Sequence, residues 1–210
     1  MIDVLFPLHG EAVPADHLYP LYAALSGLVP AFHDEATPLR FAPLTGVPGG
    51  PGMLALNEYS HLRVRLPDDR IRLVLPLAGK ALDVGGHRIR LGVPSVSPLE
   101  PAATLQARVV TFKTDARHEI TAEAFIVTAR QKLADFGLAG EVSIPLALAG
   151  DRAGEPKRKI VRIHGQAIVG YSLLVTQLSA EHSIQMQEQG LGGRTKMGCG
   201  FFLPVRKEEQ

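Results

Sequence analysis

The chain has 210 residues, a net charge of +1 and a hydrophobic fraction of 46%. That hydrophobic fraction is sufficient for a folded core and excludes an intrinsically disordered protein. The single cysteine, Cys199, excludes an internal disulfide and a zinc site built from several cysteines, and it favours a reducing compartment. No apolar run approaches the ~18 residues of a membrane span. The first residues also lack the basic stretch that opens a signal peptide. We therefore expect a cytoplasmic protein with no membrane partner.

The charge is unevenly distributed along the chain. Residues 1–60 carry a net charge of −5, and residues 61–210 carry a net charge of +6. A basic remainder after an acidic start hints at a polyanionic partner, although ordinary solvated charge explains it equally well.

The N-terminal half begins with a short apolar strand at Ile2–Pro7. Asp16 can cap a helix that Pro30 ends. The residues of this helix that recur at helical spacing and should face a core are Leu18, Leu21, Tyr22, Leu25 and Leu28.

Further strands are expected at Leu39–Pro43, His61–Leu66 and His87–Leu91. The Gly- and Pro-rich stretch Gly46–Gly52 is expected to be a loop, and a short helix should follow Asp68. This gives the order strand, helix, strand, strand, helix, strand. Prolines then mark a linker at Pro94, Pro98 and Pro101.

The same order repeats in the C-terminal half. Strands are expected at Thr104–Phe112, Glu141–Pro145, Lys159–Gly165, Gln166–Leu178 and Cys199–Val205. The first helix of this half presents a predicted apolar stripe of Ala122, Ile126, Ala129, Leu133 and Phe136, followed by Gly137. Ser179 should cap the last helix, and Gly190 should end it.

Two strand-helix-strand-strand-helix-strand units in tandem predict an α+β fold with two ferredoxin-like (RRM-like) βαββαβ domains. The expected boundaries are residues 1–95 for the N-terminal domain and residues 102–210 for the C-terminal domain. The repeat is one of pattern only, because the two halves share no sequence repeat.

The segment Gly190–Phe202 contains five glycines and two cations. Glycine permits positive φ, and successive N–H groups in such a loop can bind an anion. The residues of this segment that are candidates for binding phosphate are Gly190, Gly192, Gly193, Arg194, Lys196, Gly198 and Gly200. The segment lacks the Lys-Ser/Thr of a phosphate-binding P-loop and the glycine pattern of a dinucleotide fold. A long turn before an edge strand is the plain structural alternative.

This segment resembles the glycine-rich loop of the repeat-associated mysterious protein (RAMP) superfamily, and the resemblance implies that these glycines and cations contact RNA. Together with other stretches it is similar to the CRISPR-associated repeat-processing endoribonucleases of the myxobacterial type. The stretches that carry the likeness are Phe6–Gly10, Leu91–Pro94, Pro101–Leu105, Ser179–Gly193 and Met197–Gly200. The glycine loop alone indicates only the superfamily, whereas the combination is more specific and covers nearly the whole chain.

The resemblance implies a metal-independent endoribonuclease that requires no cofactor and cuts precursor crRNA within the repeat. In that family a histidine after the first helix often serves cleavage, and His33 matches its position. RNA can be cut by its own 2′-hydroxyl, which needs a base, an acid and charge stabilisation. Tyr22 is the second expected catalytic residue, with Tyr19 as its competitor. A lysine often completes the family's site, and Lys196 or Arg194 would supply that charge.

Four cations lie within six residues around the start of the expected strand Lys159–Gly165. These expected RNA contacts are Lys157, Arg158, Lys159 and Arg162. The arginines at 63, 65, 88 and 90 are candidates for a phosphate track or for ordinary exposed strand positions. Tryptophan is absent, so base stacking is not the main expected binding mode. A repeat RNA hairpin recognised by shape and phosphate fits better.

Other functions remain open from the sequence. A non-catalytic RNA-binding RAMP subunit of a CRISPR effector complex would keep the glycine loop and need no histidine. Other effector subunits are possible partners in either case. A ferredoxin-like small-molecule sensor would have no use for a long basic glycine loop. If His33 is not catalytic, His9 and His17 are the next candidates.

Overall fold

The computed structural model describes residues 1–113 and 120–205. The last five residues of the predicted C-terminal domain therefore lie outside the described residues. The chain forms two compact units. The first unit comprises Met1–Leu99 together with Lys196–Gly198. The second comprises Glu100–Thr195 and the chain from Cys199.

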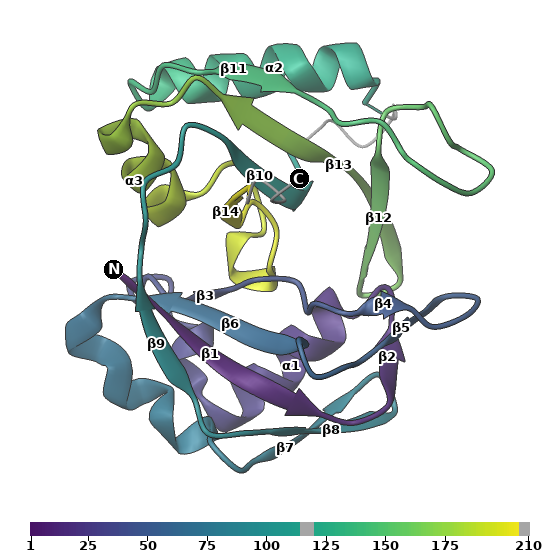
Figure 1. Cartoon of the computed structure of the whole chain (residues 1–210), viewed down its shortest axis with the longest axis vertical. Helices are drawn as coiled ribbons and strands as arrows, with labels where there is room; N and C mark the ends of the chain where they lie inside the picture. The colour runs from purple at the N-terminus through teal and green to yellow at the C-terminus, as the bar shows by residue number, and fades with distance from the viewer. Residues whose placement is uncertain (114–119, 206–210) are drawn as a thin grey trace. The chain divides into compact units, whose positions relative to one another are not determined.

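The first unit is built on an antiparallel sheet with the order β3-β6-β1-β8-β7, in which β9 also pairs with β1 (Figure 1). Its strands are β1 (Ile2–His9), β3 (Arg40–Phe41), β6 (His61–Leu66), β7 (Ala81–Val84), β8 (His87–Leu91) and β9 (Ser95–Pro98). A separate small sheet contains β2 (Ala12–Pro14), β4 (Val47–Pro48) and β5 (Met53–Ala55). The helix α1 (Leu18–Leu28) buries Leu18, Leu21 and Leu25.

The second unit repeats this plan with the sheet order β11-β13-β10-β14, and β12 extends β13 as a hairpin. Its elements are β10 (Leu105–Val110), α2 (Ala122–Asp135), β11 (Glu141–Ser143), β12 (Arg158–Ile163), β13 (Gln166–Thr176), α3 (Ala180–Gln189) and β14 (Phe202–Pro204). In both units the first long strand is central and pairs antiparallel with its neighbours. The predicted α+β class with ferredoxin-like topology is confirmed.

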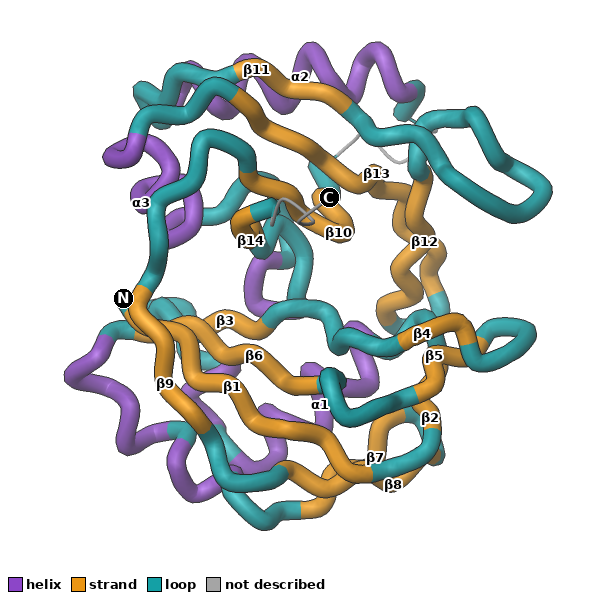
Figure 2. The backbone as a smooth tube through the Cα atoms, in the orientation of Figure 1, coloured by secondary structure: helices purple, strands orange, loops and turns teal. Residues whose placement is uncertain are grey.

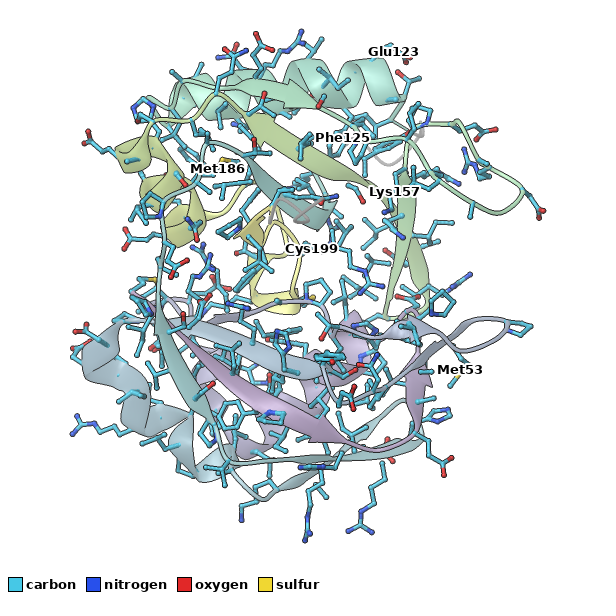
Figure 3. The ribbon with its side chains drawn as sticks, in the orientation of Figure 1. Met53, Glu123, Phe125, Lys157, Met186 and Cys199 are labelled. Carbon is cyan, nitrogen blue, oxygen red and sulfur yellow. The ribbon has the colours of Figure 1, made fainter. Side chains whose placement is uncertain are left out.

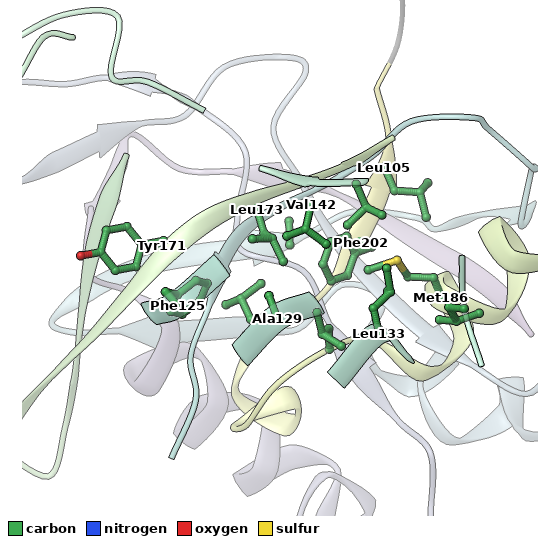
Figure 4. Close-up of a cluster of buried hydrophobic side chains, with 14 of the residues drawn as sticks. Leu105, Phe125, Ala129, Leu133, Val142, Tyr171, Leu173, Met186 and Phe202 are labelled. Carbon is green, nitrogen blue, oxygen red and sulfur yellow. The ribbon is translucent and has the colours of Figure 1, made fainter. Parts of the chain in front are cut away.

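The core of the second unit lies between the sheet and the helices α2 and α3. Phe125, Ala129 and Leu133 of α2 and Met186 of α3 are buried with sheet residues such as Leu173 (Figure 4). Of the predicted stripe on α2, Ala129 and Leu133 are in the core and Ala122 packs against it. The stripe was wrong at its other two positions, because Phe125 occupies the core in place of Ile126 and Phe136 is 42% exposed. The caps of α3 are as predicted: Ser179 accepts a hydrogen bond from the His182 N–H at 3.1 Å. Gly190 ends the helix with a φ of 68°.

Several local expectations for the first unit were wrong. Asp16 does not cap α1, whose N-cap is His17 without a side-chain cap. The short helix expected after Asp68 is two 3₁₀ segments, Asp68–Leu73 and Leu75–Leu77. Pro76 falls within this region and cannot donate an N–H to a longer helix. The expected α-helix is therefore reduced to tight turns.

The expected linker and one expected loop contain strands. Residues 95–98 of the predicted linker form β9, which pairs with β1 in register from Ile2↔Pro98 to Leu5↔Ser95. The predicted loop Gly46–Gly52 includes β4. Both strands sit at proline-containing edges, where a missing N–H is tolerated and sequence signals are weak.

Candidate active site

His33 is presented by the end of the first helix. α1 ends at Leu28, and Pro30 begins a short 3₁₀ helix, Pro30–Phe32. Phe32 is fully buried, and its ring packs edge-on against that of Phe41 at a centroid distance of 6.1 Å. His33 follows directly and is exposed. The buried phenylalanine thus anchors the segment, while the neighbouring imidazole remains accessible.

Tyr22 and His33 are in direct contact. The Tyr22 Oη and His33 Nδ1 atoms lie 2.8 Å apart, and the two rings meet edge to face at 5.3 Å. Tyr22 is on the edge of the buried face of α1, so its ring is half-buried. If the phenol donates to Nδ1, the neutral imidazole carries its proton on Nε2. Tyr22 of α1 therefore holds the His33 imidazole through one ring nitrogen, Nδ1.

The residues after His33 form a tight turn. Asp34 Oδ1 accepts a hydrogen bond from the Ala36 N–H at 3.0 Å, and Asp34 Oδ2 accepts one from the Thr37 hydroxyl at 2.5 Å. These two bonds, the Thr37 bond first, lower the pKa of Asp34 from its ordinary value. The turn is thus fixed by its own carboxylate.

Lys196 reaches the same turn within the first unit. Its Nζ donates to the carbonyl oxygen of Asp34 at 2.6 Å and also to the carbonyl oxygen of Thr37. Burial lowers the pKa of Lys196, and the charges of Glu35 and Asp34 oppose that effect. The structure therefore brings Tyr22, His33 and Lys196 to one region, although Lys196 is 163 positions after His33 in the chain.

The glycines of the predicted RNA loop have packing roles. Gly190, Gly192, Gly198 and Gly200 all have positive φ. The N–H groups of Gly190, Gly193 and Gly200 donate to the carbonyl oxygens of Met186, Thr111 and Val109, at 2.8, 2.7 and 2.8 Å respectively. These three N–H groups are thus engaged within the protein. Arg194 has a φ of 58° and is half-buried.

Two of these glycines make a matched test of the loop's packing. At Gly200 a Cβ atom would lie 2.1 Å from the carbonyl oxygen of Leu191, and φ is +65°. At Gly193 the nearest atom would be 3.7 Å away. We expect Gly200→Ala to lower the free energy of unfolding by about 2 kcal/mol or more. Gly193→Ala should change it by less than ~0.5 kcal/mol. Urea denaturation measures both, and equal values would mean that the segment repacks without strain.

The predicted RNA contacts of the second unit lie on a hairpin. Lys157 directly precedes β12, while Arg158, Lys159 and Arg162 lie within it and pair with β13 (Figure 2). Lys157, Arg158 and Lys159 are half-buried, and Arg162 is exposed. The four cations therefore lie along β12 and at the residue just before it.

Two of the arginines considered for a phosphate track instead bind a carboxylate. Arg65 is 1% exposed, and its Nε donates to Asp3 Oδ1 at 2.7 Å. The Arg63 Nη1 donates to Asp3 Oδ2 at 2.8 Å. Pairing of β1 with β6 places Asp3 opposite Arg65, which the local sequence could not indicate. Arg88 and Arg90 are exposed on β8.

His17, one of the reserve candidates for catalysis, is a structural residue. It is 1% exposed, its Nδ1 lies 3.0 Å from the Pro14 carbonyl oxygen, and its Nε2 accepts from the Leu44 N–H at 2.9 Å. Both ring nitrogens are therefore engaged. His9, the other reserve candidate, is exposed at the end of β1.

Residues 1–113 and 120–205 contain no group of three His, Cys, Asp or Glu side chains arranged to hold a metal ion. In the same part of the chain, no helix has the length and apolar character needed to cross a membrane. Cys199, labelled in Figure 3, has a buried side chain.

Comparison with known proteins gives consistent matches. A family model described as Cas6 Crispr matches residues 2–207. The chain is 40% identical over 203 residues to the CRISPR-associated endonuclease Cas6 of Myxococcus xanthus (strain DK1622), covering 97% of this chain and 81% of that protein. A solved structure named CRISPR associated protein Cas6 superposes with a TM-score of 0.69 at 15% identity, covering 98% of this chain and 99% of the other. Another, named an RAMP protein binding different RNA substrates, gives a TM-score of 0.64 at 13% identity, covering 98% of this chain and 100% of the other.

Proposed function

The chain belongs to the Cas6 family of CRISPR-associated proteins, and from this premise we propose that it is an endoribonuclease that cuts precursor crRNA within the repeat. The proposed nucleophile is the RNA's own 2′-hydroxyl. The products would be a 2′,3′-cyclic phosphate and a 5′-hydroxyl. The observation that carries the catalytic assignment is the hydrogen bond between Tyr22 Oη and His33 Nδ1.

The reaction needs one proton removed and one supplied. Attack of the 2′-oxygen on phosphorus requires loss of the hydroxyl proton, and departure of the 5′-oxygen requires gain of one. Histidine titrates near neutral pH and can perform either transfer. We assign proton transfer to the Nε2 atom of His33, because Tyr22 engages Nδ1. The exposed position of the imidazole allows an RNA phosphate to approach it.

Tyr22 and Lys196 have supporting roles in this proposal. Tyr22 orients the imidazole and fixes the nitrogen that carries the proton. Lys196 holds the turn after His33 through two carbonyl oxygens, and its ammonium charge favours a phosphate nearby. None of the three roles requires a metal ion, so the proposed cleavage is metal-independent.

The Tyr22–His33 pair favours an enzyme over a non-catalytic RNA-binding subunit. A subunit that only binds RNA needs cations and donors, and it has no need for an exposed histidine with one engaged nitrogen. Binding of a repeat RNA hairpin is assigned to the glycine-rich segment, through Arg194 and the exposed Gly192, and to the β12 hairpin. Because this substrate is a transcript, we place the activity in the cytoplasm, with other CRISPR effector subunits as partners.

Cleavage in the presence of EDTA is the direct test. We expect purified protein to cut labelled repeat RNA at the same rate with and without excess EDTA. The upstream product should end in a 2′,3′-cyclic phosphate, identified by mass spectrometry. A repeat carrying a single 2′-deoxynucleotide at the scissile position should resist cutting, because it lacks the nucleophile.

The control is the same repeat with a 2′-deoxynucleotide one position downstream, which should be cut normally. Loss of cutting in EDTA with rescue by Mg²⁺ would contradict metal independence. Cutting of the deoxy substrate at the scissile position would show that water, and not the RNA, is the nucleophile.

A further inference from the structure

Asp34 closes the turn 34–37 with both oxygens of its carboxylate. One oxygen accepts from the Ala36 N–H at 3.0 Å, and the other accepts from the Thr37 hydroxyl at 2.5 Å. The Thr37 N–H also donates to the Asp34 carbonyl oxygen at 3.2 Å. A side chain that bonds to donors two and three residues ahead fixes the backbone between them. The conformation of this turn therefore depends on the Asp34 and Thr37 side chains.

The same turn presents two main-chain carbonyl oxygens to Lys196. The ammonium group donates to the carbonyl oxygen of Asp34 at 2.6 Å and also to that of Thr37. An ammonium group has three N–H bonds, so one is left to donate to another acceptor. The two carbonyl groups belong to the first and last residues of the turn. Their spacing, and with it the position of the ammonium, therefore follows the conformation of the turn.

Lys196 is held by neutral oxygens and keeps its charge. Within residues 1–113 and 120–205 it forms no ion pair. Burial lowers the pKa of its ammonium most, and the charge of Arg40 lowers it further, whereas the charges of Glu35 and Asp34 raise it. A contact ion pair with Asp34 would neutralise the ammonium. Because the Asp34 carboxylate is engaged by donors of its own turn, that pair does not form.

The chain segment that carries Lys196 is also packed into the first unit. Gly198 has a φ of +81°, and a Cβ atom there would lie 2.9 Å from the side chains of both Leu18 and Phe41. Phe41 in turn packs against Phe32, the residue directly before the proposed catalytic histidine. Backbone packing therefore brings the segment to this region, and the turn sets where its ammonium group lies.

We infer that Asp34 and Thr37 are positioning residues for RNA cleavage. Their side chains shape the turn that holds the Lys196 ammonium at the residue following His33, with one N–H left to donate to the phosphate under attack. The inference rests on the proposed function, because the phosphate is that of the repeat RNA. Neither side chain needs to contact the RNA, since both act through Lys196.

The experiment changes the turn by single groups. Thr37→Val removes only the hydroxyl that donates to Asp34, and Thr37→Ser keeps a hydroxyl. Asp34→Ala removes the carboxylate, and Asp83→Ala is its matched control. Asp83 is another exposed aspartate of the first unit that closes a turn, accepting from the Gly86 N–H at 2.8 Å. Single-turnover cleavage of labelled repeat RNA is measured with protein in saturating excess. Affinity for uncleavable 2′-deoxy repeat RNA and thermal melting are measured alongside.

The expected change falls on the cleavage rate. Thr37→Val and Asp34→Ala should cut about 10–100-fold more slowly than wild type and bind within about twofold of it, because a displacement of ~1 Å weakens a contact made to the reacting phosphate. Thr37→Ser and Asp83→Ala should cut within about twofold of wild type, since serine keeps the donor and Asp83 lies in another turn. A purely structural role would instead lower the melting temperature and the affinity. Should Asp34→Ala melt early, the two Thr37 variants decide.

A double-mutant cycle with Lys196→Ala tests whether the turn acts through the lysine. Thr37→Val should slow a Lys196→Ala protein by less than about twofold, because the group that it positions is already absent. Independent losses of rate would overturn the inference. So would a Thr37→Val protein that cuts at the wild-type rate, or a Thr37→Ser protein as slow as Thr37→Val. In each of these cases wild type still cuts, so the proposed function stands. If wild type does not cut repeat RNA, the proposed function fails and the inference fails with it.

Discussion

His33→Ala is expected to reduce the single-turnover cleavage rate of repeat RNA by about 10²–10⁴-fold and to leave RNA affinity within about threefold of wild type. The imidazole is the proposed proton-transfer group, whereas the cations proposed to bind phosphate lie on other elements. The cleavage rate is measured at saturating RNA, and affinity is measured separately by anisotropy. The effect should therefore fall on the chemical step and not on binding.

His9→Ala is the matched control for this prediction, because His9 is also an exposed histidine of the first unit. It should cut at the wild-type rate. Tyr22→Phe removes only the hydroxyl that contacts His33 Nδ1, so its rate should lie between those of wild type and His33→Ala. A His33→Ala protein that cuts normally would move the active site elsewhere. In that case a slow His9→Ala variant would identify the replacement.

The second large effect concerns stability. Asp3→Asn is expected to lower the free energy of unfolding by about 3–5 kcal/mol. The Asp3 carboxylate is 3% exposed and binds the guanidinium groups of Arg63 and Arg65. Removing its charge leaves buried positive charge without compensation, and Arg40 beside Arg65 adds to the repulsion. Urea denaturation of the folded variant gives the value directly.

Glu155→Gln provides the comparison. The Arg152–Glu155 pair is short, at 2.6 Å, but its side chains are 54% and 51% exposed. Solvent screens such a pair, so its loss should change the free energy of unfolding by less than about 1 kcal/mol. Similar losses for the two variants would show that burial does not decide the strength of the Asp3 interaction.

The secondary structure that the sequence predicted well is stabilised by local interactions. The strand His61–Leu66 has the predicted bounds, and Ser179 and Gly190 end α3 as expected. A capping hydroxyl, a glycine with positive φ and strict alternation each act within a few residues, so the local sequence is enough to predict them. The failures lie where the local signal is weak, as in the proline-containing strand β9.

The same difference between local and long-range interactions applies to the candidate site. The sequence alone predicted the α+β class with ferredoxin-like topology, the position of His33 after the first helix, and a glycine-rich basic segment before the last strand. Only the tertiary structure decided that Tyr22 contacts His33, that Lys196 binds the turn after it, and that Arg65 is a buried partner of Asp3. The physical reason is that helices, caps and turns depend on neighbours a few positions apart. Side-chain partners 62 or 162 positions apart depend on the register between strands and on the segment Lys196–Gly198, which lies in the first unit although it is near the end of the chain. No local sequence pattern encodes either of these.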